Sequence, residues 1–170
     1  GDGAVGIGGF IGTFDGDDDY DVYASSTAYT GDILITLVAT STENYGIGGF
    51  IGYMDEPEDV DCLGCISSGS ITIEGDRVNT EIYGVGGFIG HSDEYGELIV
   101  ADSVSTVDIE ISANASSTEV YGVGGLFGYL EDIETYLDRN YYNGSITVFG
   151  GDETYNIAGF IGYFYDEEFT

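Results

Sequence analysis

The chain has 170 residues, 42% of them hydrophobic, so it is long enough for one folded domain and too apolar for a disordered segment. It carries 32 acidic residues against two arginines and no lysine, and the resulting net charge of −30 repels nucleic acid and anionic membrane surfaces. No window approaches the ~20 apolar residues of a membrane span, so we exclude nucleic acid as a partner and exclude membrane insertion.

A glycine-rich apolar octet recurs five times along the chain. Its core reads GGFIG at 8–12, 48–52 and 86–90, GGLFG at 124–128 and AGFIG at 158–162, in steps of 40, 38, 38 and 34 residues. Self-similarity at such a period is typical of solenoids and repeat arrays. We therefore predict a single repeat domain over 1–170, with repeats at about 8–47, 48–85, 86–123 and 124–157, a partial repeat at 158–170, and the end of a preceding repeat at 1–7.

The octet is predicted to form a strand. A tyrosine precedes the first small residue of each later motif by three positions, at Tyr45, Tyr83, Tyr121 and Tyr155. Strict alternation would give Tyr83 and Val85 one face and Gly84 the other, unless the Gly-Gly pair makes a bulge, which the sequence leaves open. So much glycine suits a strand only where another backbone or an aromatic ring lies close.

Stacked repeats would place the phenylalanines of the octets in one row, with a leucine in the fourth place. The residues to which we assign this structural role are Gly8, Gly9, Phe10, Gly12, Gly48, Gly49, Phe50, Gly52, Gly86, Gly87, Phe88, Gly90, Gly124, Gly125, Leu126, Gly128, Gly159, Phe160 and Gly162.

After each octet come an acidic segment, a Ser/Thr-rich or aromatic stretch and an alternating strand. The alternating strands lie at 33–37, 71–73, 107–111 and 146–148, with β-branched residues on one face. Length varies chiefly in the acidic segment, which predicts that this segment is a loop.

The sequence predicts an all-β fold, because no stretch of ten residues or more carries a helical stripe. Two or three short strands per repeat, stacked coil on coil, give a parallel β-solenoid of about four repeats of 34–40 residues plus a partial one. An antiparallel β-sandwich of hairpins is the alternative. Neither end carries a polar cap, so we expect either flanking repeats of a longer chain or head-to-tail self-association.

The repeats resemble a known family. The pattern YGVGGFIG, followed by a variable loop and a segment such as CISSGSI at 65–71 or NYYNGSI at 140–146, is similar to the GLUG repeat, which typically reads G-G-L-V-G, a short loop and N-C-Y-x-x-G-x-V. Cys65 takes the family's cysteine slot, and Asn140 takes it in the fourth repeat. The resemblance implies an extracellular or cell-surface protein of bacteria or archaea, in which such repeats form stalks of adhesin-like proteins, and it implies no catalytic residue.

Calcium is the one cofactor that the sequence suggests. Four aspartates alternate in the segment FDGDDDYDVY, at Asp15, Asp17, Asp19 and Asp21. Carboxylates two positions apart in a turning loop can converge on Ca²⁺, which takes six to eight oxygen ligands. A solvated acidic loop is the alternative.

Four glutamates stand two residues before the repeat tyrosines, at Glu43, Glu81, Glu119 and Glu153. In a solenoid they would form one column, and like charges directly opposite each other on neighbouring strands are destabilising. Outward exposure to water, an ordered cation, or stacking out of register would each relieve the repulsion.

The segment DCLGC contains both cysteines of the chain, Cys62 and Cys65. A zinc site would need further ligands that a chain with one histidine does not supply, which leaves a local disulfide or two free, partly buried thiols. Asn114 and Asn143 lie in N-x-S sequons and are candidate glycosylation sites.

Catalysis is not expected, because one His, two Arg and no Lys leave only carboxylate pairs, and 32 acids make pairs by chance. Two functions stay open. One is a structural extracellular repeat protein that forms a rigid rod, as a stalk segment or a head-to-tail subunit of a filament. The other is an adhesin-type binding module that recognises glycans or cationic surfaces through Tyr-rich acidic loops, where Tyr53, Tyr129 and Tyr163 recur after the octet.

Overall fold

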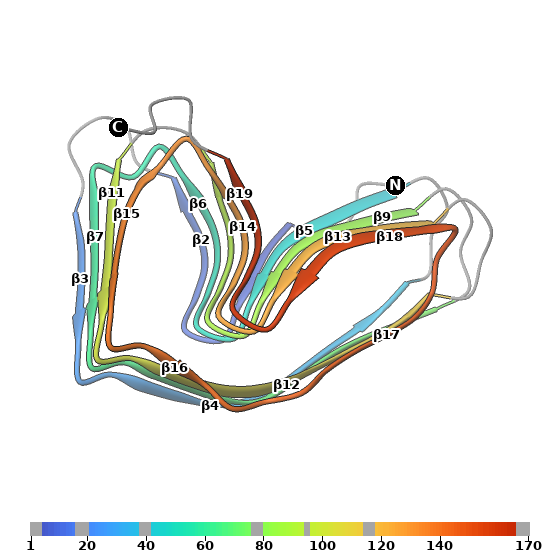
Figure 1. The fold of residues 1–170 in the computed structure, drawn as a ribbon, viewed down its shortest axis with the longest axis horizontal. Coiled ribbons are helices and arrows are strands. Elements are labelled where there is room, and N and C mark those ends of the chain that lie inside the picture. Colours follow the sequence, from blue (N-terminus) through green and yellow to red (C-terminus); the bar gives the residue numbers. More distant parts are fainter. Residues whose placement is uncertain are drawn as a thin grey trace.

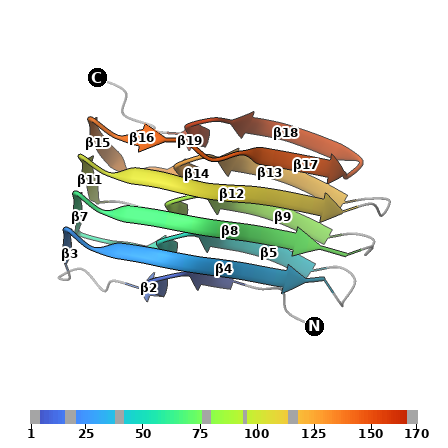
Figure 2. The ribbon, with the colours of Figure 1, turned by 90° about the horizontal axis from the view of Figure 1, so that it is seen from below.

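The computed structural model describes residues 5–15, 21–37, 42–75, 80–93, 96–113 and 118–165. Strands make up 77% of these residues, and no helix occurs among them. Every strand pairs in parallel with the equivalent strand of the next coil, so the coils pile along one axis (Figure 2). The predicted parallel β-solenoid of about four turns is confirmed, and the antiparallel sandwich is wrong.

Each coil has four strands, more than the two or three predicted, and each strand belongs to a different sheet (Figure 1). Sheet A contains β1 (Val5–Gly8), β5 (Thr42–Gly48), β9 (Thr80–Gly86), β13 (Thr118–Gly124) and β18 (Glu153–Ala158). Sheet B contains β2 (Ile11–Asp15), β6 (Ile51–Asp55), β10 (Ile89–Asp93), β14 (Phe127–Glu131) and β19 (Ile161–Tyr165).

The other two sheets complete the coil. Sheet C contains β3 (Val22–Ser25), β7 (Asp59–Leu63), β11 (Glu97–Ala101) and β15 (Glu134–Asp138). Sheet D contains β4 (Ala28–Thr36), β8 (Ile66–Glu74), β12 (Val104–Ala113), and the two short strands β16 (Tyr141–Tyr142) and β17 (Ile146–Gly150), which both pair with β12. Among the described residues, sheets A and B therefore each contain a strand of a fifth coil, β18 and β19, whereas sheets C and D end with the fourth coil.

The pairing register follows the sequence repeat. In sheet A, Tyr83 stands opposite Tyr45 on one side and Tyr121 on the other. In sheet D, Ile71 stands between Ile33 and Ile109 in the same way. Each position of the repeat thus becomes a column along the solenoid axis, and a residue that packs well in one coil packs well in the next.

The cross-section has two lobes, because sheets A and B fold inward to a shared corner (Figure 1). One core lies in the lobe formed by sheets B and C with part of sheet D, and its fully buried side chains include Phe50, Met54 and Leu98. The second core lies between sheet A and the rest of sheet D, and it includes Ile73 and Val85.

The octet forms the inward corner and is not a single strand. In the second coil β5 ends at Gly48, the chain bends at Gly49 and Phe50, and β6 begins at Ile51. Strict alternation is also wrong just before the corner, because Gly84 has a φ of 61°, in the left-handed region that favours glycine. This turn lets both Ile82 and Val85 enter the core.

Glycine is needed at the corner because backbones from two sheets touch there. A Cβ on Gly90 of sheet B would lie 2.6 Å from the carbonyl carbon of Ile47 in sheet A and 2.6 Å from the carbonyl oxygen of Gly52. A Cβ on Gly49 would lie 2.9 Å from a methyl group of Val107 in sheet D. The close approach predicted from the glycine content is therefore a narrow waist between the two lobes.

The predicted phenylalanine row forms across three coils. The rings of Phe10, Phe50 and Phe88 stack with centroids 4.9 Å apart at each step. Leu126 ends the stack, and the next ring, Phe127, meets Phe88 edge-on at 6.5 Å. The row thus lines the core of the first lobe beside the corner.

Sheet C lies where the sequence predicts a loop, so that prediction is wrong for most of the acidic segment. In β7 the acids alternate with apolar residues: Val60 and Cys62 are fully buried, while Asp59 and Asp61 are partly exposed. Because the segment is so acidic, the loop prediction missed that buried apolar residues alternate with partly exposed acidic ones, which is the pattern of a strand with one buried face.

Gly90→Ala tests the waist, because its new methyl group would overlap backbone atoms that cannot move independently. We expect the free energy of unfolding in urea to fall by about 1–3 kcal/mol. Gly159→Ala is the matched control at the C-terminal coil, since no atom lies within 4 Å of the Cβ position there. Equal effects of the two substitutions would contradict steric contact as the reason for glycine.

Candidate functional site

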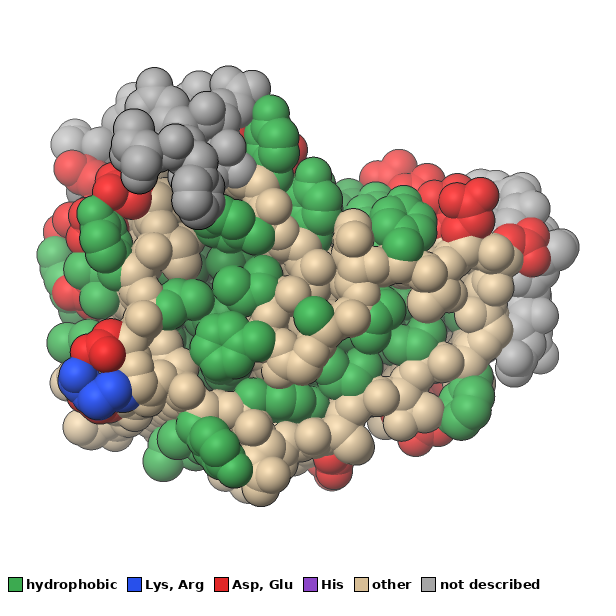
Figure 3. All heavy atoms as spheres, in the orientation of Figure 1, with side chains coloured by type: hydrophobic (Ala, Val, Ile, Leu, Met, Phe, Trp, Pro, Cys, Tyr) green, Lys and Arg blue, Asp and Glu red, His purple; other side chains and the backbone are tan. Residues whose placement is uncertain are grey.

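Sheets A and B meet at the indentation between the lobes (Figure 1). Rings on their outer faces form two columns that contact each other there. We call these eight residues the tyrosine seam: Tyr45, Tyr83, Tyr121 and Tyr155 from sheet A, and Tyr53, His91, Tyr129 and Tyr163 from sheet B. In the end-on view, hydrophobic side chains gather around this indentation (Figure 3).

Within sheet A the tyrosine rings of the seam stack face to face. Their centroids are 4.9, 5.0 and 5.1 Å apart from Tyr45 through Tyr83 and Tyr121 to Tyr155, and the rings lie within 12° of parallel. The strand spacing of a β-sheet, about 4.8 Å, imposes this separation. The ring faces are therefore occupied by one another, and edges and hydroxyl groups remain for other partners.

Rings from the two sheets also meet across the seam. Tyr45 contacts Tyr53 edge-on at 5.5 Å, and Tyr129 lies 6.1 Å from Tyr83 and 6.4 Å from Tyr121. Burial, followed by the neighbouring carboxylates Asp55 and Asp93, raises the pKa of Tyr53 well above 10. Burial and the carboxylate of Glu81 raise the pKa of Tyr121 to about 12, so the phenols are neutral at physiological pH.

His91 is the most deeply buried member of the seam, with 4% of its surface exposed. Its ring lies 4.7 Å from that of Tyr129 and 5.1 Å from that of Tyr53, between centroids. Neither ring nitrogen has a hydrogen-bond partner among the described residues. Burial lowers the pKa of His91 to about 4, so at pH 7 the ring is neutral and presents one unpaired N–H and one unpaired lone pair.

Carboxylates flank the seam on both walls. On sheet A the predicted glutamate column forms in register, from Glu43 through Glu81 and Glu119 to Glu153. On sheet B, Asp55 and Asp93 stand opposite each other on neighbouring strands, two residues beyond the seam rings. Stacking out of register is thereby excluded as the relief of charge repulsion, and burial together with Glu43 and Glu119 raises the pKa of Glu81.

The predicted calcium ligands are only partly described. Asp15 ends β2 and Asp21 directly precedes β3, whereas Asp17 and Asp19 lie outside the described residues. In the described part of the chain no group of three or more His, Cys, Asp or Glu side chains is placed to hold a metal ion. Calcium binding by this segment stays a prediction.

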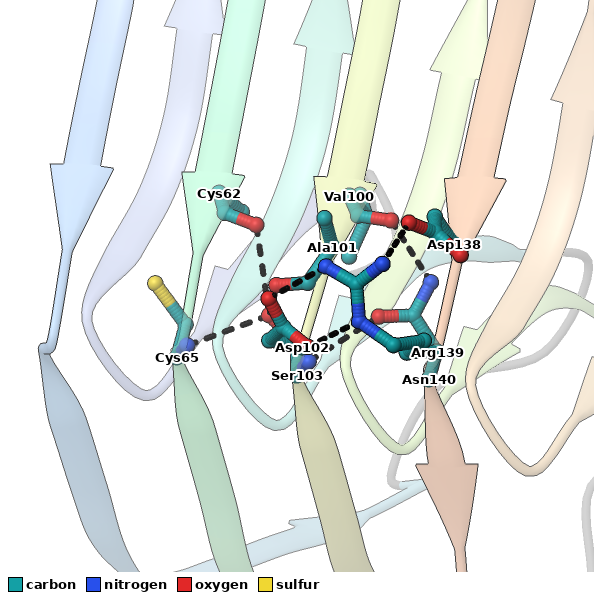
Figure 4. Close-up of polar contacts among 9 residues, drawn as sticks. All are labelled: Cys62, Cys65, Val100, Ala101, Asp102, Ser103, Asp138, Arg139 and Asn140. Carbon is teal, nitrogen blue, oxygen red and sulfur yellow. Dashed lines mark hydrogen bonds and ion pairs between the residues drawn. The ribbon is translucent and has the colours of Figure 1, made fainter.

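Both cysteines lie where sheet C turns into sheet D (Figure 4), and both are free and fully buried. The hydrogen bond from the Cys62 thiol to Cys65, together with burial, raises the pKa of the Cys62 thiol. The predicted disulfide stays a prediction.

The cysteine slot has a structural role that the sequence did not reveal. The Cys65 thiol donates to the carbonyl of Ala24 in the preceding coil, 3.4 Å away. One coil later, Ser103 Oγ donates to the carbonyl of Cys62 at 3.2 Å and accepts from the Cys65 amide at 3.1 Å. A polar side chain at this corner thus satisfies backbone groups of the coil below.

Asn140 repeats the arrangement in the fourth coil. Its Nδ2 donates to the carbonyl of Val100 at 2.7 Å, and its Oδ1 accepts from the Ser103 amide at 3.0 Å. Beside it, the exposed Arg139 donates to both carboxylate oxygens of Asp102, at 2.6 and 2.7 Å, and also to Asp138. Such an exposed pair adds little stability, so the buried contacts of Asn140 contribute more at this corner than the ion pair does.

Of the two sequons, Asn114 lies outside the described residues. Asn143 is exposed between β16 and β17, and its backbone N–H donates to the carbonyl of Ser105 at 3.0 Å. In the same sequon, Ser145 donates to Asp108 through both its amide and its hydroxyl group. Glycosylation at either asparagine stays a prediction.

Comparisons with protein-family models, with curated proteins and with solved structures found no match to this chain. The resemblance to the GLUG repeat therefore stays a prediction. Among the described residues, no helix is long and apolar enough to cross a membrane.

The sequence repeat reveals the residues of both seam columns, but it does not reveal that the two columns contact each other. Tyr45 and Tyr53 flank the octet in the same coil, and their spacing becomes informative only once the octet is known to turn a corner. His91 differs in residue type from its neighbours in the column, and that substitution was the one signal for an unpaired buried group.

Ser103→Ala removes the side chain that bonds to Cys62 and Cys65 and leaves a buried amide without a partner. We expect a loss of about 1–3 kcal/mol in the free energy of unfolding, measured in urea. Thr30→Ala is the control, because its exposed hydroxyl bonds to the side chain of Ser68 and not to a buried backbone group among the described residues. A loss no larger than that of the control would show that the corner bonds are dispensable.

Glu81→Gln removes a charge whose ionised form is disfavoured by folding. Because the pKa of Glu81 is raised in the folded state, its ionisation lowers the free energy of unfolding above that pKa, and stability is regained as pH falls through it. The variant should therefore be more stable than the wild type at pH 7 by about 0.5 kcal/mol, with a smaller gain near pH 4. Glu110→Gln should show no such gain, because Thr72 and Thr147 stand opposite Glu110.

Proposed function

We propose that the chain is a structural repeat protein of the cell exterior, whose solenoid forms part of a rigid rod, either as a stalk segment or as a head-to-tail filament subunit. The observation that supports this function is the in-register pairing of successive coils in all four sheets. Such pairing keeps the cross-section constant and ties each coil to its neighbours along its whole path.

The length of the rod must come from more coils than this chain supplies. Five strands in a sheet span about 19 Å at the usual strand spacing. The solenoid axis is also the shortest axis of the molecule (Figure 1). Rod formation therefore requires flanking repeats or stacking of further copies.

The two ends of the solenoid support such stacking. Phe10 in the first coil is 54% exposed and Phe160 in the last coil is 37% exposed, although both occupy the row that is buried in between. The end-on view shows apolar side chains inside the outline and most acidic side chains around its rim (Figure 3). The best-matched surface for either end is another coil of the same repeat, because it would extend the same columns.

Binding is the second candidate, with glycans or cationic surfaces as ligands. The tyrosines that support it, Tyr53, Tyr129 and Tyr163, lie on sheet B in the seam and not in loops, which corrects the predicted placement. The carboxylates beside them favour a cationic ligand over a neutral one.

The rod is tested by joining two copies of the chain in tandem and comparing single and double chains by small-angle X-ray scattering and negative-stain microscopy. We expect one continuous particle with about twice the height, or fibres at high concentration. Phe10→Ser should weaken association of the single chain, since it removes an exposed ring from the end face. Two separate beads in the tandem, with a single chain that stays monomeric at every concentration, would contradict the proposal.

A further inference from the structure

We propose that the tyrosine seam binds linear aliphatic polyamines, with ammonium groups paired to the carboxylates of the two walls and methylene segments lying along the tyrosine ring edges. The site lies on the side of the solenoid, not at its ends. Binding there is therefore independent of whether the solenoid belongs to a rod.

The described groups at the seam are chiefly hydrogen-bond acceptors. Glutamates of sheet A and aspartates of sheet B supply carboxylate oxygens on opposite walls. Burial, together with the carboxylates of Asp55 and Glu131, raises the pKa of Tyr53 and of Tyr129 well above 10, so both phenols keep their protons. Among the described residues, the seam and its walls carry no Lys or Arg. A ligand that donates hydrogen bonds and carries positive charge is the chemical complement of this surface.

His91 is a second and independent sign of a missing partner. Its ring is 96% buried in the floor of the seam, among Tyr45, Tyr53, Tyr83 and Tyr129, yet both of its nitrogens lack a partner. A buried polar group without a hydrogen bond costs about 1–3 kcal/mol, so a donor that displaces a covering tyrosine ring and reaches the unprotonated nitrogen would be favoured. An ammonium N–H is such a donor.

The repeat of the solenoid selects a linear ligand. From Glu43 to Glu153 the column advances three coils, about 14 Å, and an extended triamine such as spermidine spans between two and three of these steps. A single metal ion fits less well, because the described residues contain no cluster of three ligands. A neutral sugar supplies no positive charge to offset the repulsion that Glu81 receives from Glu43 and Glu119. A ligand that alternates charge and methylene groups matches both the columns and the ring edges.

The test is calorimetric titration with spermidine at a fixed ionic strength of about 0.15 M, where general charge attraction is screened beyond about 8 Å. The paired variant Glu81→Gln/Glu119→Gln should bind about tenfold more weakly, a loss in the range expected for removing charge-assisted hydrogen bonds. The control pair Glu97→Gln/Glu134→Gln removes the same charge from the acidic column of sheet C and should change the affinity less than about twofold.

Wild-type protein supplies a readout that needs no variant. His91 is the single histidine of the chain, so its ring signals in NMR spectra are assigned without ambiguity. Saturation with spermidine should shift them, whereas Mg²⁺ at the same ionic strength should not. His91→Phe keeps the aromatic volume, removes the acceptor and should weaken spermidine binding several-fold.

Four results would overturn the proposal. Equal losses in the seam pair and the sheet C pair would show general counterion attraction. Unchanged His91 signals at saturation, or Mg²⁺ binding as tightly as spermidine, would exclude the seam as a polyamine site. Tighter binding of tetralysine with the same dependence on Glu81 and Glu119 would replace the polyamine with a basic peptide as the ligand. Thermal melts of each variant establish that it is folded.

Discussion

In-register pairing of parallel strands between coils is the constraint on which the rest of the structure depends. It turns every position of the repeat into a column and multiplies the consequence of each residue type. Isoleucines such as Ile71 gain a matching neighbour above and below, and the tyrosines of sheet A gain stacked rings at the strand spacing. The same rule sets Glu81 between Glu43 and Glu119, where proximity is unfavourable.

At the corners between sheets the strands end, and local backbone turns and contacts stabilise each corner. Between sheets C and D one residue per coil takes a left-handed conformation, with φ of 50° at Ser26, 65° at Gly64 and 52° at Asp102. The next position then carries a short polar group, at Cys65 or Ser103, that bonds to the coil below. Between sheets A and B, by contrast, glycine provides the corner by removing side chains altogether.

The inward corner at the octet divides the molecule into regions with different roles. It separates two apolar cores, leaves the phenylalanine row exposed only at its two ends, and brings the outer faces of sheets A and B together along the side. The ends present backbone edges and apolar rings, which suit another coil of the same kind. The side presents phenols and carboxylates above the buried, unpaired His91, and there we propose that a soluble cation binds.

The sequence by itself determined the repeat, the all-β class, the parallel stacking and the alternating strands of sheet D, because these follow from the period of the octet and from the two-residue period of residues such as Ile33 and Ile35. It did not determine the four-sheet path: acids in β7 mimic a loop, and the turn at Gly84 depends on a φ angle that composition does not reveal. Only the tertiary structure decided that Tyr45 faces Tyr53 and that Cys65 lies over Ala24, because such contacts arise when sheets fold against one another or coils stack.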